Sequence, residues 1–293
     1  FTLDDGGHRV DSGLVEHVVV GAELGADQAD TVRRVCTQGR FVEVVVGRAG
    51  TGKTYTMNTV RHVFETAGYT VVGVAPSARA ARELHDGAGI ESYTFPRFTR
   101  HATVDESTVV VIDEAAMAGT LDLHQVISRA RQVGAKVILV GDHHQLPEIA
   151  AGGGFAAALT SAGDQACQLT INRRQHAAWE HTALDHLRNG DLPTAWQMYV
   201  DHDRVVLLDD QAAVHRRAVA DWWDTYRTGS NAHLIAGTRH EAHTLNRLAR
   251  QRLTHAGHLT GDPLDVHGKA FQIGDRIVLI QNAPGQTDAE TGH

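Results

Sequence analysis

A glycine-rich loop followed by a lysine and a threonine is the feature of this 293-residue sequence best suited to chemistry. It reads GRAGTGKT over residues 47–54, fits the pattern GxxxxGK[ST], and lies between a Val-rich run and a helix-like stretch. Such glycines let backbone N–H groups turn toward an anion, and the following helix adds the positive end of its dipole. Lys53 is expected to contact β- and γ-phosphates, and the Thr54 hydroxyl to bind Mg²⁺. The predicted nucleoside triphosphate site consists of Gly47, Ala49, Gly50, Thr51, Gly52, Lys53 and Thr54.

Two acidic side chains follow a second Val-rich run. Asp113 and Glu114 come directly after VVVI, and ligands of open α/β sheets bind at the carboxyl ends of strands. Hydrolysis of a triphosphate needs a carboxylate for the metal and a group that orients or deprotonates the attacking water. We therefore expect Asp113 to hold Mg²⁺ and Glu114 to act on the water. By itself, an acidic pair at such a place could equally cap the next helix.

A polar segment, GDHHQLP, ends a third apolar run at residues 141–147. Gln145 carries an uncharged amide, which is better suited to sensing a γ-phosphate than to removing a proton. Taken alone, this segment is an ordinary polar loop.

The elements that must position these residues alternate along the chain. Short runs rich in Val and Ile are separated by stretches of the length of a crossover helix, which indicates a parallel sheet buried on both faces. The runs span residues 41–47, 70–76, 107–114 and 135–142. The predicted fold is a doubly wound α/β domain.

A second alternation begins after Cys167. Apolar runs at 204–210, 232–238 and 276–282, with helical stretches between them, suggest a second α/β unit that is cut short. Residues 1–26 show turn and charge signals without periodicity, so we expect a linker from something upstream, and Phe1 suggests a piece of a longer protein. The expected division is 1–26, 27–168 and 169–293.

Composition excludes several classes of protein. The net charge is −8, so any contact with nucleic acid must be local. The two cysteines form no CxxC pair, and the 20 histidines show no metal-ligand spacing, so we expect buried thiols and solvated histidines. The longest apolar runs reach about five residues, whereas a membrane helix needs roughly 20. We therefore expect a cytoplasmic chain with no membrane insertion.

Together, these segments resemble the superfamily 1 DNA helicases of the RecD-like branch, and more narrowly the helicase part of MobF-type conjugative relaxases of actinobacterial plasmids. The resemblance implies a P-loop, RecA-like domain followed by a second, incomplete RecA-like domain, because the last motifs of the family are missing. The matching segments, in the order of the family, are LGADQ (24–28), GRAGTGKT (47–54), APSARAARELHDGAGIESYTF (75–95), VIDEAAMAGT (111–120), VGDHHQLPEIAAGGGF (140–155) and LTINRRQ (169–175).

The resemblance also implies roles for single residues. Gln28 matches the glutamine that reads adenine, although it could equally be an exposed helix residue. Gln145 matches the residue that couples the γ-phosphate to the DNA channel. Arg174 matches an arginine that stabilises charge on the transferring phosphoryl group, with its neighbour Arg173 as the alternative. The residues implied to contact DNA are Ser77, Arg79, Thr94, Phe95, His143 and Arg239, and for Phe95 a core position is as good an interpretation.

The function implied is an ATP-dependent helicase or translocase that moves 5′ to 3′ on single-stranded DNA, with ATP and Mg²⁺ as cofactors. Single-stranded and forked DNA would be its substrates, and a relaxase domain in the same chain and the conjugation machinery its further partners. Two alternatives stay open: an NTP-binding module with little turnover, and the motor subunit of an ATP-dependent exonuclease.

Overall fold

A computed structural model of the chain describes residues 6–144, 152–175, 177–266 and 268–277. The chain divides into two compact units, Phe1–Ala195 and Trp196–His293, and α9 (Leu192–Asp201) crosses the division. None of the helices in the described ranges is both long and apolar enough to cross a membrane.

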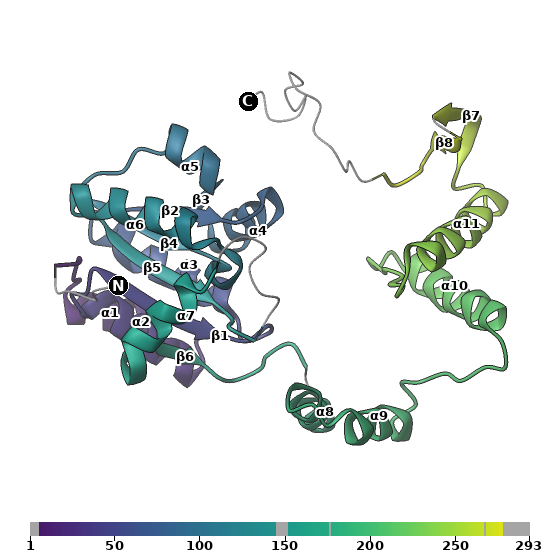
Figure 1. The fold of residues 1–293 in the computed structure, drawn as a ribbon, viewed down its shortest axis with the longest axis horizontal. Helices are drawn as coiled ribbons and strands as arrows, with labels where there is room; N and C mark the ends of the chain where they lie inside the picture. Colours follow the sequence, from purple (N-terminus) through teal and green to yellow (C-terminus); the bar gives the residue numbers. More distant parts are fainter. Residues whose placement is uncertain (1–5, 145–151, 176, 267, 278–293) are drawn as a thin grey trace. The chain divides into compact units, whose positions relative to one another are not determined.

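The first unit is built on one parallel sheet of six strands in the order β3-β2-β4-β5-β1-β6 (Figure 1). Every strand pair in it is parallel, which confirms the doubly wound α/β fold expected from the apolar runs. The short edge strands β3 and β6 were not predicted. The strands are β1 (Val42–Gly47), β2 (Thr70–Ala75), β3 (Glu91–Thr94), β4 (Thr108–Ile112), β5 (Lys136–Gly141) and β6 (Cys167–Leu169).

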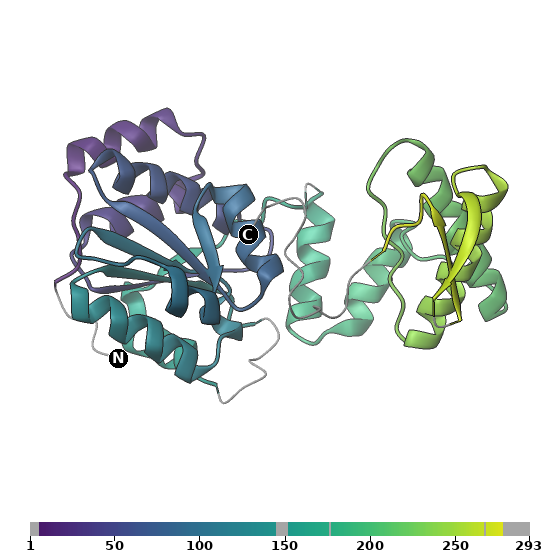
Figure 2. The ribbon, with the colours of Figure 1, turned by 90° about the horizontal axis from the view of Figure 1, so that it is seen from above.

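Helices cover both faces of this sheet, as Figures 1 and 2 show. Alternate side chains of each central strand enter opposite cores: Val44 packs with α5, α6 and α7, whereas Val45 packs with α1 to α4. Burial on both faces explains why these strands are continuous apolar runs. The helices that cover the sheet are α1 (Ser12–Gly21), α2 (Ala26–Thr37), α3 (Lys53–Thr66), α4 (Ala78–Ala88), α5 (Phe95–His101), α6 (Thr120–Val133) and α7 (Gly154–Ala162). Helix α8 (Ala178–Arg188) follows later in the chain and, within the described ranges, contributes no residue to either core.

The predicted linker at 1–26 is wrong for most of its described length. Helix α1 occupies residues 12–21, and the Asp11 carboxylate caps it by accepting from the N–H groups of Gly13 and Leu14. Val15 and Val19 are buried in the core that α1 shares with α2 and α3. This segment therefore belongs to the first unit, because the apolar side of α1 packs against the helices on one face of the sheet.

The second unit differs from the expected α/β arrangement. Helices α10 (Gln211–Arg227) and α11 (Arg239–His255) form where the sequence predicts them, and β7 (Thr260–Val266) pairs antiparallel with β8 (Lys269–Ile273). The strands predicted at 204–210 and 232–238 do not form. In the described part of this unit the one sheet consists of β7 and β8, which pair with each other and not with these runs. Of the third run, 276–282, only residues 276 and 277 are described, and they form no strand.

The division between the units also falls later than residue 168. Strand β6 pairs with β1, with Val45 opposite Cys167, so it completes the sheet of the first unit. Helix α8 belongs to this unit as well.

A buried ion pair fixes the end of the sheet at which β1 and β5 begin. Lys136 is fully buried, and its ammonium group donates to the carbonyl oxygens of Gln38 and Arg40 at 2.9 Å each and to Glu43 Oε1 at 3.4 Å. Replacement of Lys136 by methionine leaves the Glu43 carboxylate buried with only the Arg40 guanidinium, 3.7 Å away, as a cationic partner. We expect the free energy of unfolding to fall by about 3–5 kcal/mol, and by less when Glu43→Gln is added. Urea denaturation of the single and double variants checks this, and equal losses in both would contradict it.

Candidate nucleotide site

The phosphate loop lies between β1 and α3, as predicted. Gly50 and Gly52 have φ angles of +88° and +80°, a region that side-chain-bearing residues rarely adopt, so the loop requires glycine at both positions. The Thr51 hydroxyl donates to the Arg48 carbonyl at 2.8 Å and closes the turn. Lys53 Nζ donates to the Gly47 carbonyl at 2.9 Å, so the lysine folds back over its own loop. Its ammonium group therefore lies where the loop would receive an anion.

The acidic pair lies at the carboxyl end of β4, between β2 and β5. The Asp113 N–H donates to the Val74 carbonyl at 2.9 Å, and the Glu114 N–H donates to Asp113 Oδ1 at 2.9 Å. Glu114 has a φ of +48°, a strained conformation for a residue with a side chain, of the kind that clusters at functional sites. Glu114 Oε2 is buried and has no hydrogen-bond partner among the described residues. This oxygen is available to a water molecule or another ligand.

One hollow of about 430 Å³ brings the predicted groups together. Its walls include the phosphate loop, the acidic pair from β4, the start of α4 and the segment after β6. The residues that line it are Arg48, Ala49, Gly50, Gly52, Lys53, Thr54, Ala80, Glu83, Asp113, Glu114, Arg173 and Arg174.

The chemistry of these groups fits a magnesium ion bound to a triphosphate. Burial and the nearby Glu114 charge raise the pKa of Asp113 to about 6, while the charge of Lys53 acts against this rise. The carboxylates of Asp113 and Glu114 and the Thr54 hydroxyl, which line the same hollow, are hard oxygen donors of the kind that Mg²⁺ prefers. Thr54 and Asp113 would hold the ion.

The raised pKa of Asp113 has a consequence for stability in the nucleotide-free protein. Because its value in the fold, about 6, exceeds the ordinary 3.8, stability is lost as the pH rises from about 3.8 to about 6 and is regained as the pH falls from about 6 toward 3.8. Asp113→Asn is therefore expected to raise the free energy of unfolding at pH 8 by about 1–2 kcal/mol, with a smaller gain at pH 5. Denaturation in EDTA at both pH values measures this. A gain that is the same at both would contradict it.

The two neighbouring arginines differ in their surroundings. The Arg173 guanidinium pairs with the Asp27 carboxylate and donates to the carbonyl oxygens of Thr51 and Ile171, both at 2.9 Å. Arg174 is exposed and lines the hollow, and its guanidinium makes no hydrogen bond or ion pair within the described ranges. The arrangement leaves Arg174 available to a ligand, and its action on the phosphates stays a prediction.

Gln28 lies beneath the phosphate loop and does not line the hollow. Its side chain is buried, Oε1 accepts from the Gly25 N–H at 3.0 Å, and Nε2 donates to the Gly52 carbonyl at 3.3 Å. The interpretation of Gln28 as an exposed helix residue is wrong, because the side chain is buried and its amide bonds within the protein. Adenine recognition by Gln28 stays a prediction, and it would require these bonds to be exchanged.

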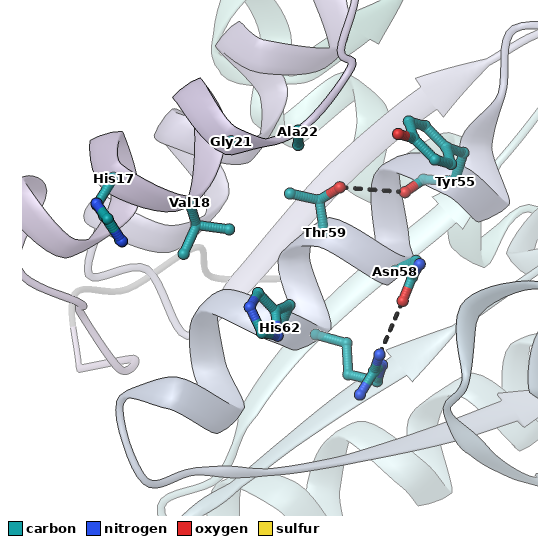
Figure 3. A pocket seen from close by; sticks show the side chains of 9 residues that line it. His17, Val18, Gly21, Ala22, Tyr55, Asn58, Thr59 and His62 are labelled. Carbon is teal, nitrogen blue, oxygen red and sulfur yellow. Dashed lines mark hydrogen bonds between the residues drawn. The ribbon is translucent and has the colours of Figure 1, made fainter.

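A second hollow, of about 410 Å³, lies between α1 and α3 (Figure 3). Tyr55, which directly follows Thr54, lies at one end of it, and His62 lies two turns further along α3. The Thr59 hydroxyl donates to the Tyr55 carbonyl at 3.4 Å. The hollow is lined by His17, Val18, Gly21, Ala22, Tyr55, Asn58, Thr59, Arg61 and His62.

Of the residues expected to contact DNA, Phe95 is a core residue. It is the first residue of α5 and is buried in the same core as Val74 and Phe98, so it cannot stack on a base without leaving the core, and the DNA-contact interpretation is wrong. Thr94, the residue before α5, is half-buried.

The remaining predicted DNA contacts are spread over the chain. Ser77 caps α4 by accepting from the Ala80 N–H, and the exposed Arg79 pairs with Glu83 at 2.8 Å. His143 is exposed, and its ring centroid lies 4.0 Å from that of His144 at a tilt of 41°. Arg239 begins α11 in the second unit, and Gln145 lies outside the described residues.

Sequence reasoning missed Glu83 and Asp27, and it named Arg173 only as the alternative to Arg174. Glu83 lines the hollow from α4, whereas Asp27 and Arg173 join the start of α2 to the segment after β6. Asp27 and Arg173 are 146 residues apart, and their opposite charges alone do not signal a pairing over such a separation.

Comparison with known proteins confirms the resemblance inferred from the sequence. The family model described as "AAA domain" matches residues 23–210. The conjugal transfer protein TraA of Agrobacterium fabrum is 34% identical over 268 residues, which cover 88% of this chain and 24% of that protein. The ATP-dependent RecD2 DNA helicase of Deinococcus radiodurans is 31% identical over 138 residues, 44% of this chain and 19% of that protein.

Among solved structures, an arterivirus nonstructural protein 10 helicase with DNA matches 50% of this chain and 40% of its own, with a TM-score of 0.34 and 14% identity. The chain spans about a quarter of the length of the TraA relatives that it matches.

Proposed function

Because this chain belongs to the AAA domain family through residues 23–210, we propose that it hydrolyses Mg²⁺-bound ATP to move 5′ to 3′ along single-stranded DNA. Forked DNA is its substrate, and a relaxase domain of the same protein and the conjugation machinery are its partners. The observation that carries the proposal is the single hollow lined by Lys53, Thr54, Asp113, Glu114 and Arg174.

Each of these groups has a distinct task in the proposed hydrolysis. Lys53 exchanges the Gly47 carbonyl for phosphate oxygens, and the bound Mg²⁺ supplies charge neutralisation at those oxygens. Glu114 orients or deprotonates the attacking water through its unpartnered Oε2. Arg174 stabilises the charge that develops on the transferring phosphoryl group.

Among the residues that the structure describes, Glu114 Oε2 has no hydrogen-bond partner and Arg174 has no ion pair, which favours hydrolysis over passive binding. A module that only binds a triphosphate needs neither a group for the water nor a cation for the transition state. A motor couples these groups to movement by closing and opening around the nucleotide.

Phosphate release by the whole protein, measured with and without a short single strand, tests this function. We expect stimulation by DNA, and faster unwinding of a duplex that carries a 5′ single-stranded tail than of one that carries a 3′ tail. Binding of ATP with slow turnover that DNA does not change would instead support the nucleotide-binding module.

A further inference from the structure

The segment at residues 170–175, which follows β6 and carries Arg174, is attached directly to the phosphate loop. The Arg173 N–H donates to the Gly50 carbonyl at 2.7 Å, and Arg173 Nη1 donates to the Thr51 carbonyl at 2.9 Å. The approach is close, because a Cβ added at Gly50 would lie 2.7 Å from Asn172 Oδ1. A movement of this segment therefore moves the loop as well.

A single carboxylate connects this segment to the start of α2. Asp27 Oδ2 accepts from the N–H groups of Thr170 and Ile171 at 2.9 and 3.0 Å, and Oδ1 pairs with Arg173 Nη2. The Asp27 side chain is only 10% exposed. Three parts of the first unit, the first turn of α2, the segment 170–175 and the phosphate loop, meet at Asp27 and Arg173.

The shape of the backbone leaves room for the arginine. A Cβ added at Gly25 would lie 2.0 Å from Arg173 Nη2, although Gly25 has an ordinary φ of −70°. Glycine is therefore needed at position 25 to make room for the ion pair, and not because of the local backbone conformation.

The pair differs from the surface ion pairs of the same unit. In the pair between Arg33 and Glu16 the side chains are 42% and 51% exposed, and such pairs contribute little to stability. Burial raises the pKa of Asp27, but the hydrogen bond from Arg173 and the two backbone donors outweigh it and hold the pKa below its ordinary value. Asp27 stays ionised and is bonded by charge-assisted hydrogen bonds.

We propose that Asp27 and Arg173 are positioning residues that hold segment 170–175 against the phosphate loop, so that the next residue, Arg174, faces the phosphates. The inference rests on the proposed hydrolysis and deepens it. The Arg174 N–H donates to Asn172 Oδ1 at 2.9 Å and the Arg173 N–H to the Gly50 carbonyl at 2.7 Å, so the backbone that leads into Arg174 is fixed by the same small segment. Arg173 also lines the hollow, but its guanidinium is engaged by Asp27 and by the carbonyl oxygens of Thr51 and Ile171, so we assign it a positioning role rather than a contact with the phosphates.

Replacement of Arg173 by methionine tests the positioning role in the whole protein. Because a misplaced group about 1 Å from its productive position can cost about 10²-fold in rate, we expect kcat to fall about 10–100-fold while KM changes less than about threefold. The variant Arg33→Met removes a surface ion pair from the same helix, α2, and is expected to leave both constants unchanged. In a protein that already carries Arg174→Ala, Arg173→Met should cause almost no further loss, because the group that it positions is gone.

Binding supplies a readout that does not depend on turnover. The wild type is expected to bind ADP with aluminium fluoride, a mimic of the transferring phosphoryl group, more tightly than ADP, and Arg173→Met should lose this preference while its affinity for ADP is kept. Gly25→Ala keeps both charges, displaces the Arg173 guanidinium and should reproduce the effect. It also provides the test should Arg173→Met fail to fold.

The results that overturn the inference are distinct from those that overturn the function. If Arg173→Met lowers kcat by the same factor in the wild-type and in the Arg174→Ala background, the pair between Asp27 and Arg173 has a general structural role only. Wild-type kcat in both Arg173→Met and Gly25→Ala would remove any role. By contrast, hydrolysis at the wild-type rate in Lys53→Ala would refute the proposed function itself.

Discussion

Replacement of Arg174 by alanine is expected to slow ATP hydrolysis about 10³-fold while it changes the affinity for ATP only a few-fold. The guanidinium lines the phosphate hollow and has no ion pair within the described ranges, so it is available to a ligand whose charge increases in the transition state. An interaction made mainly in the transition state lowers kcat and leaves ground-state binding almost intact. Single-turnover phosphate release and ATP titration measure the two quantities separately.

The matched control is Arg188→Ala. Arg188 lies on α8 and pairs with Asp185 at 3.1 Å, and it does not line the hollow. We expect this variant to hydrolyse ATP at the wild-type rate. An Arg174→Ala protein with undiminished kcat would show that this arginine does not act on the phosphates.

Replacement of Lys53 by alanine is expected to remove both binding and hydrolysis. Lys53 is the one lysine among the residues that line the hollow. Without its ammonium group, the phosphate loop loses a cation that offsets the repulsion of the triphosphate by Asp113 and Glu114. We expect the dissociation constant for Mg·ATP to rise at least about 100-fold, which corresponds to about 2.7 kcal/mol. Calorimetric titration measures the affinity, and DNA-stimulated phosphate release measures the activity.

Asn58→Ala is a suitable control for this variant, because Asn58 lies on α3 but faces the neighbouring hollow between α1 and α3 (Figure 3). Its affinity for Mg·ATP should remain close to that of the wild type. Turnover by Lys53→Ala at the wild-type rate would refute the assignment of the phosphate loop.

The sequence predicts the centre of the fold better than its edges, for a physical reason. Strands β1, β2, β4 and β5 are buried on both faces and are therefore apolar along most of their length, a pattern that is visible without a structure even though β1 and β5 carry the buried pair Glu43 and Lys136. The edge strands β3 and β6 have only four and three residues and include polar side chains, so they carry no such signal. Strand formation in the second unit depends on neighbours, which the apolar runs alone do not supply.

Helix α1 illustrates a signal that was present but weak. Asp11 precedes Ser12 and Gly13, and an aspartate before a helical stretch is a typical N-cap. The stretch is short, however, and glycines stand at both ends, so its periodicity does not stand out.

The site shows the same contrast between local and distant information. Lys53, Thr54, Asp113 and Glu114 could be placed together because each lies at the carboxyl end of a strand of one sheet. The ion pair between Asp27 and Arg173 could not, because its partners are 146 residues apart and belong to segments that meet only in the folded unit. Phe95 was ambiguous because an aromatic residue after a strand suits a core as well as a base, and only its burial decides between them.

The most direct test of the central claim compares the affinity for ATP with and without Mg²⁺ in the wild type and in Asp113→Asn. If the loop at Lys53 and the carboxylates converge on one Mg²⁺-bound triphosphate, Mg²⁺ should tighten wild-type binding at least about tenfold, which is about 1.4 kcal/mol, and Asp113→Asn should lose most of that gain. Asp113→Asn should nevertheless keep the wild-type affinity for metal-free ATP, or exceed it. A full magnesium effect in Asp113→Asn would show that the two groups do not share a ligand.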